Sequence, residues 1–191
     1  MTSRLTLVSP AISAALREAR FDDGCPLDAS GLRAARAAAG AVPAAERVLA
    51  SPSARCRETA AALGLDAAET PELAGLDVGR WRGATLAEVG EREPEALAAW
   101  LADPASAPHG GESVRALRDR VAVWLDTASG DTGRTVAVVE PEIVRAALLS
   151  ALDAPDTAFW RTDVRPLTAV ELSGRSGRWN LRLGSPLAGP A

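Results

Sequence analysis

Arg55 lies at the start of a predicted helix, where its guanidinium could bind an anion. The apolar run Arg47-Val48-Leu49-Ala50 predicts a buried strand, and a helical pattern follows it as far as Leu63. Ser51 is expected to cap this helix, and Pro52 suits its first position. Anions bind well at a helix N-terminus beside the carboxyl edge of a sheet. The alternative is an ordinary capped helix with a solvated arginine.

Glu140 and Glu142 form a second chemically capable group, directly after the β-like run Thr135–Val139. Acidic residues around Pro141 suit a helix start, and Glu140 could form an ion pair with Arg55 that fills a pocket. Alternatively, burial would raise the pKa of Glu140 and make it a general acid or base, with Arg55 orienting a carboxylate or carbonyl substrate. Glu142 is then a candidate ligand-binding residue.

The chain offers few side chains that could act as a histidine base or as a nucleophile. His109 is the only histidine and precedes two glycines. It could contact a ligand and move protons, or it could be a loop residue with a satisfied hydrogen bond. Ser9, after the first predicted strand, is a candidate ligand-binding residue. Ser9 and Cys56 are nucleophiles only formally, because neither has an identifiable histidine base beside it.

The elements that position these residues alternate between strand and helix. Apolar runs predict strands at Leu5–Val8, Ala44–Leu49 and Thr135–Val139, and a hairpin at Leu167–Leu172 and Trp179–Leu183. Helical spacing is found in the segments Gly31–Ala39, Ser53–Leu63, Thr85–Val89, Pro94–Leu101, Ser113–Asp126 and Ile143–Leu152. This alternation predicts an α/β fold, a three-layer α/β/α sandwich around a mostly parallel central sheet, with the hairpin at one edge.

Four sequence patterns follow one another along nearly the whole chain. They are Ser51-Pro52-x-x-Arg55-x-x-x-Thr59-Ala60, Gly79-x-Trp81-x-Gly83, Gly110-Gly111-Glu112-Ser113 and the strand-to-helix segment Val138 to Arg145. This ordered set resembles the histidine phosphatase superfamily, the phosphoglycerate-mutase-like enzymes. The resemblance implies that family's fold, with an insertion at about residues 73–108 that roofs the pocket and selects the substrate. It also implies that Ser9, Arg55 and Glu140 converge.

The resemblance does not extend to the catalytic residues. In the family the first strand ends in Arg-His-Gly, and that histidine accepts the phosphoryl group; here the corresponding residues are Ser9-Pro10-Ala11. The second catalytic histidine falls at Glu140, and the acidic proton donor falls at Gly75. Of the usual pocket only Arg55 remains. The resemblance therefore implies a degenerate member that lacks phosphohistidine catalysis.

Composition and charge argue against several classes of partner. A net charge of −4 without a basic tract argues against a nucleic-acid or anionic-membrane surface. No stretch approaches the roughly 18 uninterrupted apolar residues of a membrane span. Cys25 and Cys56 make neither a disulfide framework nor a metal site, and favour a reducing, cytoplasmic location. No metal or cofactor is expected.

Three functions remain as expectations. The leading one is a pseudoenzyme that binds a small ligand or a protein partner. The second is an enzyme that performs acid/base chemistry on a small polar or carboxylate metabolite with Glu140 and Arg55, and the third is residual phosphatase or mutase activity. Residues 1–185 are expected to form a single domain and residues 186–191 a loose tail. Trp160 and the hairpin edge are candidate contacts of a homodimer.

Overall fold

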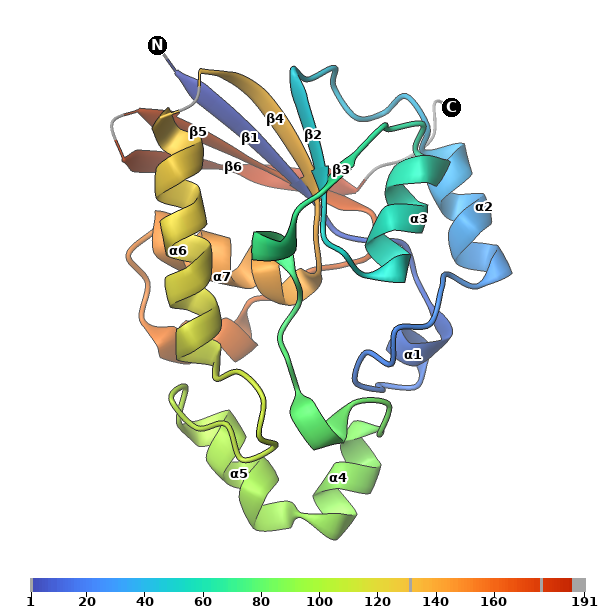
Figure 1. Cartoon of the computed structure of the whole chain (residues 1–191), viewed down its shortest axis with the longest axis vertical. Helices are drawn as coiled ribbons and strands as arrows, with labels where there is room; N and C mark the ends of the chain where they lie inside the picture. Colours follow the sequence, from blue (N-terminus) through green and yellow to red (C-terminus); the bar gives the residue numbers. More distant parts are fainter. Residues whose placement is uncertain (1, 131, 176, 187–191) are drawn as a thin grey trace.

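The computed structural model describes residues 2–130, 132–175 and 177–186, which form a six-stranded mixed sheet flanked by helices (Figure 1). The strands are β1 (Ser3–Val8), β2 (Arg47–Ala50), β3 (Ala68–Glu69), β4 (Gly133–Val138), β5 (Thr168–Arg175) and β6 (Arg178–Pro186). Their order is β3-β2-β4-β1-β5-β6. The first four pair in parallel, whereas β5 and β6 run antiparallel to their neighbours. The predicted mostly parallel sheet is confirmed.

Helices cover both faces of this sheet, as predicted. The α-helices are α1 (Ala14–Arg17), α2 (Ala29–Ala37), α3 (Ala54–Ala62), α4 (Leu86–Arg92), α5 (Pro94–Ala102), α6 (Val114–Gly130) and α7 (Pro141–Ala151). On one face, α6 and α7 pack on side chains such as Leu7 and Leu172. On the other face, α3 and the end of α2 pack on Val8 and Val136. Alternate residues of each strand thus face opposite layers, as the pleat requires.

The helix start at Arg55 differs from the prediction in one respect. Ser53, not Ser51, is the N-cap of α3, and its hydroxyl accepts a hydrogen bond from the Cys56 amide at 3.2 Å. The Ser51 amide instead donates to the Val138 carbonyl at 2.9 Å. The sheet therefore continues to hold the backbone through Ser51, and the expected capping role of Ser51 and the expected helical position of Pro52 were both wrong.

The C-terminal hairpin is confirmed at one edge of the sheet. β5 ends at Arg175, β6 begins at Arg178, and these two residues pair. Pro186, the first residue of the expected tail, lies in β6 opposite Thr168. Residues 187–191 of that tail lie outside the described part of the chain.

A roof built from α4 and α5 lies beyond the carboxyl ends of the parallel strands (Figure 1). Thr85 begins α4 with a reciprocal capping box, in which its hydroxyl and the Glu88 carboxylate each bond the other residue's amide. Trp81 and Trp100 are 1% and 4% exposed and meet edge to face, so both tryptophans anchor the roof. In the described residues, no helix has the length and apolar character needed to cross a membrane.

Candidate functional site

Arg55 and Glu140 form a buried ion pair at the carboxyl ends of β2 and β4. Arg55 Nε donates to Glu140 Oε1 at 2.9 Å, and Nη2 lies 2.5 Å from Oε2. The two residues are 8% and 1% exposed. Burial alone would lower the pKa of Arg55, but the charge of Glu140 and its hydrogen bond outweigh that effect and raise it. The Nε bond is a charge-assisted hydrogen bond, while the Nη2–Oε2 contact is an ion pair that does not meet hydrogen-bond geometry.

The backbone on both sides of the pair explains why these side chains meet. Arg55 lies in the first turn of α3, and Glu140 occupies the N-cap position of α7 without capping it through its side chain. The Glu140 carboxylate is therefore directed to the guanidinium instead of the helix amides. Asp22 adds a further carboxylate, with Oδ1 3.9 Å from Arg55 Nε. The predicted contact between Arg55 and Glu140 is thus present in the structure.

Ser9 lies in the same region, but its hydroxyl is occupied by backbone groups. The Ser9 hydroxyl donates to the Arg165 carbonyl at 2.6 Å and accepts from the Thr168 amide at 2.9 Å. The side chain is fully buried and ties the end of β1 to the start of β5. Pro10, the next residue, contributes to the pocket wall described below. The structure therefore places Ser9 as a structural anchor beside the site and Pro10 at its surface.

Gly75 and Glu142 show a steric relationship that the sequence does not reveal. A Cβ atom added at Gly75 would lie 3.0 Å from Glu142 Oε1 and 3.1 Å from Glu140 Cγ. The two glutamates thus occupy the space that a side chain at position 75 would need. Burial and the charge of Glu140 raise the pKa of Glu142, while the charge of Arg55 opposes this shift.

His109 lies in the roof, apart from the ion pair. Its Nδ1 accepts a hydrogen bond from the Gly111 amide at 3.1 Å, and its ring centroid is 5.0 Å from that of Trp81. The side chain is 2% exposed, and burial lowers its pKa. The Nδ1 bond fits the interpretation of His109 as a loop residue, whereas its buried Nε2 has no hydrogen-bond partner among the described residues.

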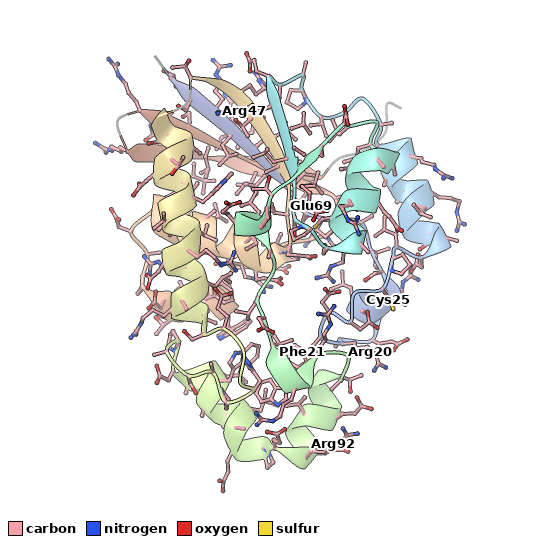
Figure 2. All side chains as sticks on the ribbon, viewed as in Figure 1. Arg20, Phe21, Cys25, Arg47, Glu69 and Arg92 are labelled. Carbon is pink, nitrogen blue, oxygen red and sulfur yellow. The ribbon has the colours of Figure 1, made fainter. Side chains whose placement is uncertain are left out.

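A pocket of about 290 Å³ lies next to the ion pair, between the segment after β1, the roof and the C-terminal part of the chain. Pro10 and Arg55 both line it. Figure 2 places Arg20 and Phe21 where the segment after α1 meets the roof; the Phe21 amide donates to the Ala84 carbonyl at 2.9 Å. The remaining wall of the pocket comes from α7, from the 3-10 helix η3 (Asp156–Arg161) and from the residues that follow η3.

Sequence reasoning missed several residues of this pocket. Asp22, Arg145, Trp160 and Asp163 all line it. Arg145 had an available signal, because it follows Glu142 by three residues and so lies on the same face of α7. Trp160 and Asp163 had none, since they reach the pocket only through the tertiary fold. Among the described residues, no group of three or more histidine, cysteine, aspartate or glutamate side chains is arranged to hold a metal ion.

Comparison with solved structures supports the fold independently. Mycobacterial glucosyl-3-phosphoglycerate phosphatase is similar with a TM-score of 0.81 at 23% identity, covering 95% of this chain and 97% of that one. The alpha-ribazole phosphatase of Shigella flexneri gives a TM-score of 0.83 at 20% identity, with 98% of each chain covered. At these identities the likeness concerns the fold alone.

Sequence comparison identifies the family. Bifunctional protein Rv2228c of Mycobacterium tuberculosis is 37% identical over 137 residues, which are 65% of this chain and 36% of that protein. The chain thus matches only about a third of the length of this curated relative. The family model of the histidine phosphatase superfamily (branch 1) matches residues 14–185, which begin after β1. The chain belongs to the histidine phosphatase superfamily.

Proposed function

We propose that this chain is a member of the superfamily that has lost phosphohistidine catalysis and binds a small ligand in the pocket beside Arg55. The observation that carries the proposal is the buried Arg55–Glu140 ion pair, with a contact of 2.9 Å between Nε and Oε1. The arginine that the resemblance implies as a phosphate ligand is already held by a carboxylate of the chain itself.

The chain also offers no nucleophile at the position where the resemblance implies one. Pro10 has no group that could accept a phosphoryl unit. The neighbouring Ser9 hydroxyl is engaged with the Arg165 carbonyl and the Thr168 amide, and no histidine base lies next to it in the sequence. His109 packs against Trp81 in the roof. These placements favour a binding function over phosphoryl transfer.

Electrostatics point in the same direction. A phosphate dianion at this site would meet the carboxylate of Glu140, which is 1% exposed. Two like charges about 4 Å apart repel by roughly 4 kcal/mol at an effective dielectric constant of about 20. Arg55 cannot offset this fully, because its charge is shared with Glu140 and with Asp22 at 3.9 Å. The site therefore disfavours the substrates of the family's reaction.

A phosphatase assay tests the proposal directly. The substrates are those named for the structural relatives: glucosyl-3-phosphoglycerate, alpha-ribazole phosphate and phosphoserine. We expect no phosphate release above background from the wild-type protein. Turnover that persists through repurification and disappears in Arg55→Ala would contradict the proposal.

Glu142 favours a second candidate function, acid/base catalysis on a small polar or carboxylate metabolite. Its pKa is raised by burial and by Glu140, and its side chain lines the pocket. Glu140, the candidate expected from the sequence, is instead held in the ion pair. For this function, Glu142→Gln would abolish turnover of such a metabolite while the melting temperature stayed close to that of the wild type. Unchanged turnover in that variant would exclude it.

A further inference from the structure

Arg145 is the cation of this pocket that has no carboxylate partner. Its Nε donates to the Thr162 carbonyl at 2.8 Å, and its Cζ lies 5.8 Å from the ring centroid of Phe159 and 6.0 Å from that of Trp160. The side chain is half-buried and lines the pocket. Among the described residues, no carboxylate lies within ion-pair distance of it.

The other two arginines of the pocket differ from Arg145 in this respect. Arg55 is held by Glu140, and Arg20 Nη2 lies 2.7 Å from Glu18 Oε2. Glu142 and Asp163 act on Arg145 only at a distance, so an anion from solution could still make a direct contact with its half-buried guanidinium. Burial lowers the pKa of Arg145, while the charges of Glu142 and Asp163 oppose this shift. The anion-binding capacity of the pocket therefore lies at Arg145 and not at Arg55.

The wall beside Arg145 is apolar. Trp100 and Trp160 line the pocket with their ring centroids 4.4 Å apart, and Phe21 lies 5.7 Å from Trp100. Leu76, Val78 and Val164 extend the same surface. A ligand with an apolar body would therefore remove aromatic and aliphatic surface from water, in a pocket just below the usual range of about 300–1,000 Å³ for small-molecule sites.

We propose that the pocket binds a small monocarboxylate with an aromatic or branched apolar body, whose carboxylate contacts the free guanidinium nitrogens of Arg145. This inference rests on the proposed loss of phosphohistidine catalysis and names the ligand class of the same site. A guanidinium matches a carboxylate with two parallel hydrogen bonds. A phosphate ester is disfavoured, because Asp22, Glu142 and Asp163 line the same pocket and only Arg145 is free to balance a second negative charge.

The test uses three probes that share one aromatic ring. 3-Phenylpropionate carries a single negative charge, 3-phenylpropionamide is its neutral analogue, and phenyl phosphate is a dianion. Binding is measured on the wild-type protein by calorimetry and by intrinsic tryptophan fluorescence, to which the pocket residues Trp100 and Trp160 contribute. We expect saturable binding of 3-phenylpropionate, with the amide and phenyl phosphate each about tenfold or more weaker.

Two variants with a matched control assign the binding to Arg145. Arg145→Met should weaken 3-phenylpropionate binding about tenfold or more, and Arg145→Lys should lose less because the charge is kept. Arg92→Met is the control: it removes the same charge from an exposed position of α4 in the roof (Figure 2). It should bind as the wild type does. The comparison of probes on the wild type does not depend on whether a variant folds.

Equal binding of the acid and the amide, or no saturable binding of the acid at millimolar concentration, would overturn the inference. Preferential binding of phenyl phosphate would also overturn it. Phosphate release from phenyl phosphate that is lost in Arg55→Ala would instead overturn the proposed function. The two failures are therefore distinguishable, because one is read from binding and the other from turnover.

Discussion

Removing either partner of the Arg55–Glu140 pair should destabilise the protein strongly. The residues are 8% and 1% exposed, so the remaining partner would be a buried charge without its counter-charge. Breaking a buried pair in this way costs about 3–5 kcal/mol. For a domain of this size, that corresponds to a fall of roughly 6–20 °C in the melting temperature. The variants Arg55→Met and Glu140→Gln test this in urea unfolding followed by circular dichroism.

The two single variants should differ. Arg55 retains Asp22 at 3.9 Å when Glu140 is replaced, whereas Glu140 without Arg55 is left close to Glu142. Arg55→Met should therefore be the more damaging change. Its isolated Glu140 would be a buried carboxylate beside Glu142 without a counter-charge.

The double variant Arg55→Met/Glu140→Leu, measured together with the single variants Arg55→Met and Glu140→Leu, completes a thermodynamic cycle. An apolar replacement of a buried pair is often neutral or stabilising, so the double variant should lose much less than the sum of the singles. The control is the exposed ion pair between Arg57, also in α3, and Glu69, with Nε 3.8 Å from Oε2. Glu69→Gln should change the free energy of unfolding by about 0.5 kcal/mol or less. Single losses and a coupling energy both below about 1 kcal/mol would refute the argument that this pair is desolvated and structural.

Three further predictions concern the surroundings of the site. Thr85→Ala removes one half of the capping box with Glu88 and should lower the free energy of unfolding by about 1 kcal/mol, measured by urea denaturation. The folded-state pKa of Glu142 is raised, so its ionisation destabilises the folded state. This destabilisation is absent below the pKa of Glu142 in the unfolded chain and grows as the pH rises through its pKa in the folded protein. Glu142→Gln should therefore flatten this part of the curve of stability against pH. Gly75→Asp places a Cβ 3.0 Å from Glu142 Oε1 and a charge beside Glu140, so a lower melting temperature is expected, with partial recovery in Gly75→Asp/Glu142→Ala.

Most of the fold could be predicted from the sequence because its signals are local. The predicted strands Leu5–Val8 and Thr135–Val139 end within one residue of where β1 and β4 end in the structure. The helix predicted to start at Thr85 does begin there, with Thr85 as its N-cap. The cap of α3 was misplaced because Ser51 and Ser53 are both good caps, and a sheet hydrogen bond from Ser51 to Val138 decides between them. Such competition between long-range and local bonds is not visible in a single segment.

The site was only partly predictable. Arg55 and Glu140 are 85 residues apart, and only the resemblance to a known fold indicated that they meet. The pocket beside them could not be derived, because its walls come from the segment after β1, the roof, α7 and η3. The unpaired state of Arg145 depends on the absence of a nearby carboxylate in three dimensions, which no spacing rule provides.

The most direct test of the central claim is a thermal-shift titration with orthovanadate on the wild type and on Arg55→Ala. A ligand at about 100 times its dissociation constant would stabilise the folded state by about 2.7 kcal/mol, or roughly 5–11 °C in a domain of this size. Because Glu140 already occupies Arg55, we predict no shift of the wild-type melting temperature at millimolar vanadate. A saturable rise of several degrees that disappears in Arg55→Ala would show that the pocket still binds phosphate-like anions and would contradict the account.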